Sequence, residues 1–430
     1  MRRFVSTDPG FIAAMEAFLA EPRGTEEAVS DAVSAIIAAI RREGDEALAA
    51  YTRRFDGFDP GQVGLQVTKD EVEAAAAGIP QPLNEALALA ARRIEAFHRK
   101  QLPADLDFRD EAGARMGLRW TPLDAVGIYV PGGKAAYPSS VLMNALPARV
   151  AGVSRIAMCV PAPGGVLNPL VLAAAKRAGV TEIYRVGGAQ AVAALAYGTA
   201  SIPPVDRITG PGNAYVAEAK RQVFGRVGID SIAGPSEVLV IADSANDPAH
   251  LALDLLAQAE HDEAAQSILI TDSAEFADRV AEAVDAALKA LPRASIAGAS
   301  WHDHGAVIIV RSWEEAAEIA NRVAPEHLQI MLDDPSTLFG KIRHAGAIFL
   351  GRNCPEAIGD YIAGPNHVLP TSGTARFASG LSVYDFLKRT SWVSLGGGAL
   401  DAIGPAAVRL AEAEGLDAHA RSVKARLRES

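Results

Sequence analysis

The sequence has few cysteines and no surplus of positive charge. It holds two cysteines among 430 residues, Cys159 and Cys354. Two thiols cannot build a disulfide framework or a cysteine-rich zinc module, so a reducing, cytoplasmic compartment is expected. Lysine and arginine number 41 against 52 aspartates and glutamates, a formal net charge of −11. The chain therefore lacks the basic stripe that neutralises phosphates, and no nucleic-acid partner is expected.

Long apolar runs are also missing. No stretch approaches the roughly 20 apolar residues of a bilayer-spanning helix, so no membrane partner is expected. The N-terminal segment starts basic and turns apolar, but Asp8, Pro9 and Glu16 interrupt it, which argues against a signal peptide. Hydrophobic residues still make up 49% of the chain, enough for large cores. Composition favours a soluble protein of about two to four domains that acts on small molecules.

The hydrophobic pattern predicts an α/β protein. Residues 26–55 and 83–102 carry apolar side chains at helical spacing. Over residues 125–224, and again over 236–351, short apolar runs alternate with helical stretches. Such alternation is typical of parallel sheets. The tail from about residue 380 has a helical pattern, so we expect two α/β units between helical ends.

Glycine-rich turns follow several of the predicted strands. They are VPGG (130–133), VGGAQA (186–191) and TGPGNAY (209–215). Such turns let the backbone approach a phosphate at the start of a helix. The dinucleotide fingerprint G-x-G-x-x-G does not occur in the chain. The pattern therefore indicates a dinucleotide site only weakly, and close packing in tight turns explains these glycines equally well.

Gln258 and His261 raise the question of a metal site. They lie in LLAQAEHDEAAQS (255–267), which has the apolar spacing of a helix, and residues three apart share a helix face. Amide oxygen and imidazole nitrogen both ligate zinc. Two ligands do not make a site, so this pair is either half of a metal centre or an ordinary polar face. The sequence must supply the other ligands.

A second histidine pair is less promising. His302 and His304 flank Asp303 in SWHDHG, and on an extended segment they would share a face and could chelate a metal. A solvated loop before the strand AVIIV is the favoured interpretation, because nothing nearby completes a site.

Two further segments could carry chemistry. Glu326 and His327 are a usable acid–base set in PEHLQIML, provided that an irregular junction at Pro325 lets both face one cleft; capping or pairing at the strand start is an equal alternative. The long loop 359–380 contains Asp360 and His367 and is typical of a binding segment.

The two cysteines are weaker candidates for a catalytic role. Cys354 could attack an aldehyde. No base adjoins it in the sequence, so a nucleophilic role is the less favoured interpretation. Cys159 lies in an apolar strand and is expected to belong to the core.

Together the motifs resemble the histidinol dehydrogenase family. They occur in order over almost the whole chain: YVPGGKAAYPSSVLM, VGGAQAVAALAYGT, ITGPGNAYVAEAK, IAGPSEVLV, LAQAEHD, APEHLQ, GDYIAGPNHVLPT and EGLDAH. The resemblance implies an NAD⁺-dependent, zinc-dependent enzyme that oxidises L-histidinol through L-histidinaldehyde to L-histidine. It also implies two incomplete Rossmann-like domains with helical N- and C-terminal tails, in an intertwined homodimer.

The resemblance assigns roles to individual residues. His327 would be the general base, and Glu326 would activate water. One zinc ion per subunit would be bound by four side chains: Gln258, His261, Asp360 and His419, the last reaching across from the partner. Substrate would contact Ser236, Gln258, His261, His327, Asp360, His367, Glu414 and His419. NAD⁺ would contact Tyr129, Gln190 and Asn213.

The same resemblance divides the chain into domains. Residues 1–25 would be an N-terminal tail, and residues 381–430 a C-terminal tail that reaches the partner. Residues 26–128 plus 237–380 would form the first Rossmann-like domain, and residues 129–236 the second. Two other functions stay open. One is a relative that oxidises another small alcohol, such as a sulfonated diol. The other is a non-catalytic metal-binding or assembly protein.

Overall fold

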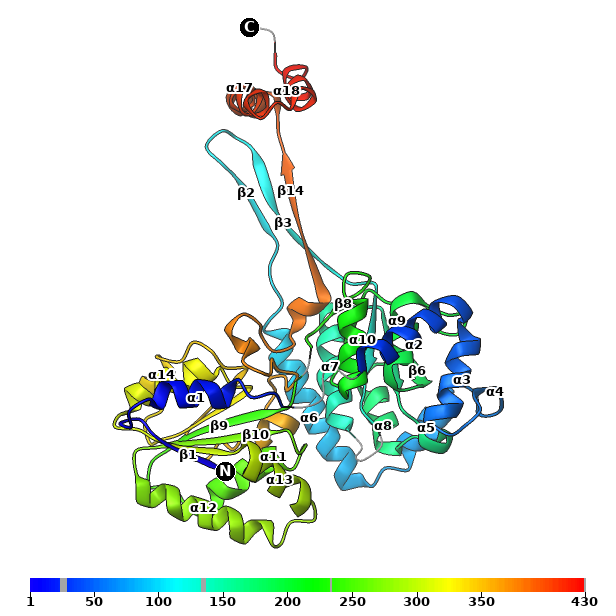
Figure 1. Ribbon diagram of the computed structural model, residues 1–430. Coiled ribbons are helices and arrows are strands. Elements are labelled where there is room, and N and C mark those ends of the chain that lie inside the picture. Colours follow the sequence, from blue (N-terminus) through cyan, green and yellow to red (C-terminus); the bar gives the residue numbers. More distant parts are fainter. Residues whose placement is uncertain (24–28, 133–136, 233, 429–430) are drawn as a thin grey trace.

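The computed structural model describes residues 1–23, 29–132, 137–232 and 234–428 (Figure 1). In these residues the chain forms two parallel sheets covered by helices, and a three-stranded antiparallel arm that projects from the body. The expected mixed α/β class is confirmed. The expected turn at 130–133 lies partly outside the described residues. Within them, no helix is both long and apolar enough to cross a bilayer.

The first sheet has five parallel strands in the order β6-β5-β4-β7-β8. The chain runs outward from β4 to β6 and then returns to the other side of β4 for β7 and β8. Open α/β sheets bind ligands at the carboxyl edge of such a switch point. The elements of this unit are β4 (Ala125–Tyr129), α7 (Pro138–Ala151), β5 (Arg155–Val160), the 3-10 helix η2 (Pro163–Gly165), α8 (Pro169–Ala178), β6 (Glu182–Arg185), α9 (Gly188–Tyr197), β7 (Arg207–Thr209), α10 (Ala214–Val223) and β8 (Gly228–Ile229).

The N-terminal helices pack against this five-stranded sheet. Ile40 lies in the same buried cluster as Tyr129, and Ile94 in the same cluster as Val126. The helices are α2 (Ser30–Glu43), α3 (Asp45–Phe55), α4 (Pro60–Val63), α5 (Lys69–Ala77) and α6 (Gln81–Arg99).

This packing differs from the expected grouping of residues 26–128 with residues 237–380. The apolar stripe of a helix shows which face is buried, but it does not show which sheet covers that face.

The second sheet has six parallel strands in the order β1-β11-β10-β9-β12-β13, again with a switch point, here between β9 and β12. Its strands are β1 (Arg2–Val5), β9 (Glu237–Ala242), β10 (Gln266–Thr271), β11 (Ala306–Ile309), β12 (His327–Met331) and β13 (Ala347–Leu350). Its helices are α1 (Phe11–Leu19), α11 (Pro248–Ala259), α12 (Ala274–Leu288), α13 (Ala294–His304), α14 (Trp313–Val323), α15 (Ser336–Phe339), α16 (Ala357–Tyr361) and η3 (Thr374–Arg376). The short 3-10 helix η4 (Val383–Phe386) instead packs in the core of the five-stranded unit.

The segment of His302 and His304 is helical, so its expected loop is wrong. Both residues end α13, where His302 is exposed and His304 is partly buried. Residues two apart do not face each other on a helix, so the two rings do not form a chelating pair. Trp301, which is fully buried, anchors this turn to the core and explains why it is not a loop.

Both chain ends contain strands as well as the expected helices. Residues 2–5 form β1 beside β11, and residues 387–394 form β14 beside β3. Each strand pairs with a segment hundreds of residues away in the chain, and such partners leave no local periodic signal.

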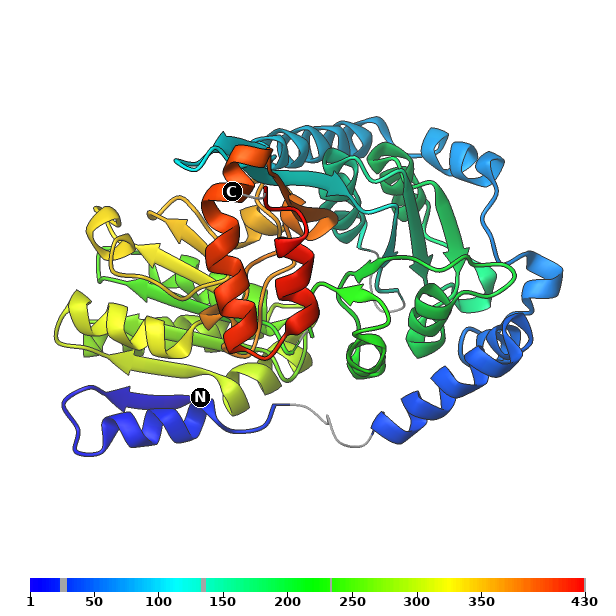
Figure 2. The ribbon, with the colours of Figure 1, turned by 90° about the horizontal axis from the view of Figure 1, so that it is seen from above.

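The C-terminal strand belongs to the arm, which carries two helices at its tip (Figure 1). Seen from above, these helices lie over the region between the two α/β units (Figure 2). Large apolar side chains are exposed along the arm, namely Leu106, Phe108, Val393, Leu395, Ile403, Leu410 and Leu416. Its elements are β2 (Leu106–Arg109), β3 (Arg115–Pro122), β14 (Leu387–Ser394), α17 (Gly397–Ala413) and α18 (Asp417–Lys424).

Candidate active site

Several side chains expected to carry the chemistry meet at the amino-terminal ends of β9 and β12. These two strands lie side by side and parallel, so Ser236 precedes one at the edge where Glu326 precedes the other. At the end of α14, Ala324 takes the left-handed conformation, with φ of 51°, and Pro325 follows. The irregular junction expected between helix and strand is therefore present, and it brings Glu326 and His327 together.

The backbone of Glu237 holds both of these side chains. Its N–H donates to Oε2 of Glu326 over 2.9 Å, and its carbonyl oxygen accepts from Nδ1 of His327 over 3.1 Å. Oε2 of Glu326 lies 3.7 Å from Nδ1 of His327. A neutral ring whose Nδ1 donates has its lone pair on Nε2. His327 therefore presents Nε2 as a base, next to a carboxyl group.

Gln258 and His261 lie at the end of α11, in contact with each other. The amide nitrogen of Gln258 is 3.4 Å from Nδ1 of His261. The helix ends at Ala259, so the expected helix over 255–267 is wrong in its second half, and β10 begins at Gln266. A backbone bond from the His261 N–H to the Gln258 carbonyl keeps both residues in one turn.

His367 comes from the long loop, as expected, whereas Asp360 lies in the short helix α16, where the sequence predicted a loop. Nδ1 of His367 donates to the carbonyl oxygen of Asp360 over 3.0 Å, and Oδ1 of Asp360 lies 3.9 Å from Nε2 of His327. The loop reaches the other α/β unit, where Asn366 donates to the carbonyl oxygen of Met143 over 2.6 Å. The cluster therefore lies at the boundary between the two units, a common place for ligand sites.

Glu356 is a site residue that the sequence analysis missed. It is buried, and its Oε1 lies 4.0 Å from Nδ1 of His327. Among the described residues, His327, Glu356 and Asp360 offer ligand atoms within 4.8 Å of one another. Glu356 precedes Asp360 by four residues, one helical turn, and this spacing is the signal that could have found it.

The site combines acidic and imidazole groups in a water-poor setting. Burial, reinforced by the carboxylates of Glu237 and Asp360, raises the pKa of Glu326 well above its usual range. Burial also raises the pKa of Asp360 to about 6. It lowers the pKa of His327 to about 3 and that of His367 to about 4, and the nearby His261 contributes to both shifts. Ionisable side chains with shifted pKa values that gather in one cleft are typical of active sites.

Two of the expected substrate contacts lie far from this cluster in the same chain. Glu414 follows α17 and His419 lies on α18, both exposed at the tip of the arm (Figure 1). The structure therefore brings together Ser236, Gln258, His261, Glu326, His327, Asp360 and His367, but not these two.

The three expected nucleotide contacts lie at the carboxyl edge of the five-stranded sheet. Tyr129 ends β4, and its hydroxyl accepts a hydrogen bond of 3.1 Å from the N–H of Gly188. Gln190 is buried in the first turn of α9, and its Oε1 has no hydrogen-bond partner among the described residues. Asn213 caps α10 through its Oδ1. All three surround the switch point between β4 and β7.

The comparisons with known proteins identify the family. A family model described as histidinol dehydrogenase matches residues 19–427. The chain is 64% identical to histidinol dehydrogenase of Gluconobacter oxydans, over 99% of both chains. The chain belongs to the histidinol dehydrogenase family. It is also 62% identical to histidinol dehydrogenase of Rhodospirillum rubrum, over 99% of this chain and 98% of that one. The crystal structure of histidinol dehydrogenase from Elizabethkingia anophelis shares the fold, with a TM-score of 0.94 and 36% identity over 99% of this chain and 98% of that chain.

The donor set of this histidinol dehydrogenase family member fits a zinc ion. Oε1 of Gln258 is buried and has no hydrogen-bond partner in the part of the chain that the structure describes. An unpaired buried amide oxygen is costly, and a cation would satisfy it. Imidazole from His261 and carboxylate from Asp360 are further zinc ligands of the ordinary kind.

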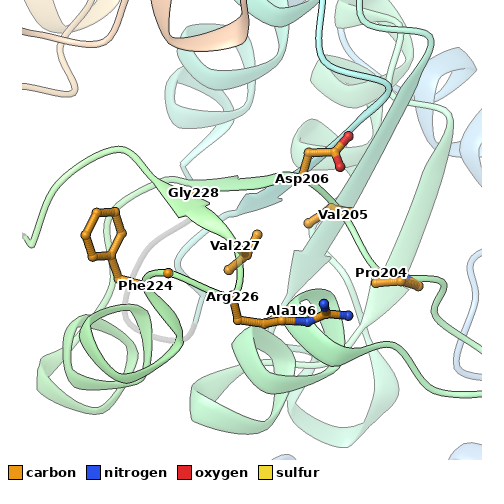
Figure 3. Close-up of a pocket in the computed structure, with 9 residues that line it drawn as sticks. Ala196, Pro204, Val205, Asp206, Phe224, Arg226, Val227 and Gly228 are labelled. Atoms are coloured by element: carbon orange, nitrogen blue, oxygen red, sulfur yellow. The ribbon is translucent and has the colours of Figure 1, made fainter. Parts of the chain in front are cut away.

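Other features of the family member stand apart from this site. Cys159 is buried in β5, where burial raises the pKa of its thiol, and Cys354 is partly exposed. An open cavity of about 360 Å³ lies between the ends of α9 and α10 and the strands β7 and β8, lined by residues such as Val205, Phe224 and Arg226 (Figure 3). Phe224, Arg226 and Asp206 frame this cavity, and none of the expected site residues line it.

Proposed function

We propose that this protein oxidises L-histidinol to L-histidine through L-histidinaldehyde, with two NAD⁺ per substrate. The observation that carries the proposal is the cluster of Gln258, His261, Glu326, His327 and Asp360, in which Gln258, Glu326 and His327 are buried. It supplies a base, a second proton acceptor and metal ligands within one site. The family's name, and those of its relatives in Gluconobacter and Rhodospirillum, support histidinol as the substrate. The product places the enzyme in histidine biosynthesis.

Zinc and NAD⁺ have separate places in this proposal. Gln258, His261 and Asp360 would hold one zinc ion per subunit, with His419 of a second copy as the fourth ligand. The metal would orient the imidazole and amine of the substrate, and the nicotinamide would accept hydride. Tyr129, Gln190 and Asn213 would contact the nucleotide at the switch point of the five-stranded sheet.

His327 is the proton acceptor for the alcohol step. Its Nδ1–H is fixed by the carbonyl of Glu237, so Nε2 is free to take the hydroxyl proton of histidinol. Because burial disfavours the charged ring, the imidazole is neutral and ready to accept that proton before the reaction. Loss of this hydroxyl proton accompanies loss of hydride from the carbon that carries the hydroxyl group, which yields the aldehyde.

Glu326 serves the second step. Its carboxylate takes a proton from a water molecule, whose oxygen attacks the aldehyde carbon, while His327 returns the proton of the first step to the aldehyde oxygen, which gives the hydrate. Loss of a second hydride, with a proton to His327, leaves the carboxylic acid of histidine. Ser236 and His367 line the site as substrate contacts. A buried site limits the escape of the reactive aldehyde.

The arm supports a homodimer. Glu414 and His419 are exposed at its tip, together with apolar side chains such as Leu410 and Leu416. Exposed apolar surface on a projecting element is typical of a protein–protein interface. We propose that the arm of each subunit crosses to its partner and completes the partner's site with these two residues. Both cysteines are free, in keeping with the cytoplasmic compartment that we propose.

Incubation of purified protein with L-histidinol and NAD⁺ tests this function. Formation of L-histidine with NADH is the expected result. Turnover of a sulfonated diol in place of histidinol would indicate a relative that oxidises another small alcohol, and bound zinc without turnover of either substrate would indicate a binding protein.

A further inference from the structure

The peptide groups of Glu237 are the common support of the two proposed catalytic side chains. Its N–H binds Glu326 and its carbonyl oxygen binds His327, as described above. A shift of this one residue would therefore change the position of Glu326. It would also release the hydrogen bond that keeps the His327 proton on Nδ1.

The side chain of Glu237 is itself held in a buried ion pair. Its Oε1 accepts from the guanidinium of Arg23 and from the N–H of Ser372 over 3.2 Å. The side chain of Glu237 is 5% exposed and that of Arg23 is 10% exposed. The preceding backbone is fixed against the same loop, because the N–H of Gly234 donates to Oγ1 of Thr371 over 2.7 Å.

Arg23 comes from a distant part of the chain. It is 214 residues away from Glu237 and ends the N-terminal segment that contains β1 and α1. An ion pair taken out of water is sensitive to loss of one partner, because the remaining charge stays buried and unpaired. Without Arg23, the Glu237 carboxylate would be more stable near water or near another hydrogen-bond donor. A movement of this side chain toward either would displace the peptide groups of Glu237.

We propose that Arg23 is a positioning residue of the active site, which acts through Glu237 on Glu326 and His327. The inference rests on the proposed function, in which these two side chains move protons. It gives the N-terminal segment a role in catalysis through the contact of Arg23 with Glu237.

Four variants of the full-length protein test the inference. Arg23→Met leaves the Glu237 carboxylate buried without its positive partner. Glu237→Gln leaves the Arg23 guanidinium buried without its negative partner. Arg23→Lys keeps the charge, and the double variant Arg23→Met/Glu237→Gln removes the charge from both sides. Arg2→Met is the matched control, because Arg2 pairs with Glu21 over 2.6 Å on the same segment, exposed to solvent. Zinc content and thermal unfolding are measured for each.

We expect Arg23→Met to lower kcat by about ten- to a hundredfold with little change in either KM, because small displacements of catalytic groups have effects of this size. Arg23→Lys and the double variant should recover kcat to within about threefold of the wild type, since the energetic effects of contacting residues are not additive. Arg2→Met should match the wild type. Unchanged kcat in Arg23→Met, or a double variant as slow as Arg23→Met, would overturn the inference.

A second measurement separates this inference from the proposed reaction. Nitrogen-15 spectra of histidine-labelled protein report which ring nitrogen carries the proton, whether or not histidinol turns over. We expect a His327 signal of the Nδ1–H form in the wild type and in Arg23→Lys, and its loss in Arg23→Met. Identical spectra of Arg23→Met and the wild type would overturn the positioning role. If the two spectra differ as expected but the wild type does not oxidise histidinol, only the proposed function is overturned.

Discussion

Oδ1 of Asp360 lies 3.9 Å from Nε2 of His327, on the opposite side of the ring from the Nδ1–H that Glu237 holds. The lone pair of the proposed base therefore points toward the proposed metal ligands. A substrate bound to the metal would have its reacting carbon beside this base. This relationship brings the proposed acid–base group and the proposed metal ligand Asp360 into one cluster.

Removal of one metal ligand should abolish activity without unfolding the protein. His261→Ala deletes a proposed zinc ligand from a turn after α11, so we expect loss of bound zinc and at least about a hundredfold loss of turnover. Metal analysis and circular dichroism measure the two effects. His302→Ala, on the exposed face of α13, is the control and should keep its zinc. Full activity of His261→Ala with no bound metal would refute the ligand assignment.

The two proton acceptors should affect different steps. His327→Asn removes the base at Nε2 and should slow histidinol oxidation by about 10²- to 10⁴-fold, the usual contribution of general base catalysis. Glu326→Gln removes the group that activates water, so histidinaldehyde oxidation should suffer more than histidinol oxidation. Rates are measured separately with each substrate. A Glu326→Gln enzyme impaired only with histidinol would show that the role of Glu326 is assigned wrongly.

A site shared between subunits should be restored by mixing two inactive variants. His261→Ala damages the site of its own subunit, and His419→Ala would damage the site of the partner. In a hybrid dimer one site carries both changes and the other carries neither. After subunit exchange of a 1:1 mixture, we expect about a quarter of wild-type activity, since half of the dimers are hybrids with one intact site each. A sample of His419→Ala alone, taken through the same subunit exchange, should stay inactive. A mixture that recovers no activity would show that His419 acts in its own subunit's site or lies outside the site.

The turn that carries Asn213 depends on a buried ion pair. Nζ of Lys220 pairs with Asp230 and donates to the carbonyl oxygen of Gly210 over 3.0 Å, while Oδ2 of Asp230 accepts from the Gly210 N–H over 2.8 Å. Lys220→Met leaves a buried carboxylate unpaired, so we expect the free energy of unfolding to fall by about 3–5 kcal/mol.

Urea titration measures this loss, with an exposed pair as the control. Lys424 pairs with Glu412, and the two side chains are 54% and 48% exposed. Lys424→Met should therefore lower the free energy of unfolding by less than about 1 kcal/mol. Equal losses in the two variants would show that burial of the Lys220 pair contributes nothing extra to stability.

Much of the site could be predicted from short motifs. Gln258 and His261 are close in the chain, and so are Glu326 and His327, so local spacing indicated that the members of each pair lie together, as they do in the structure. The α/β alternation predicted both sheets because buried parallel strands are short apolar runs between helices. Arg23 could not be predicted in the same way, because its partner Glu237 is found only through a tertiary contact.

The remaining differences have similar physical causes. Helix α6 shows an apolar stripe, but the sequence does not say that it packs on the five-stranded sheet rather than the six-stranded one. β14 is amphipathic only weakly, and its pairing with β3 forms an exposed arm that a helical pattern does not anticipate. His302 and His304 were expected in a solvated loop and instead end a helix, because the neighbouring Trp301 is buried in a tertiary contact that local polarity does not reveal.

The number of NADH formed per L-histidinol consumed tests the central claim most directly. It is measured on purified protein as isolated, after chelation, and after return of zinc. The account predicts two NADH per histidinol, loss of turnover with the chelator and recovery with zinc. One NADH per histidinol with release of the aldehyde, or turnover that chelation leaves unchanged, would contradict it.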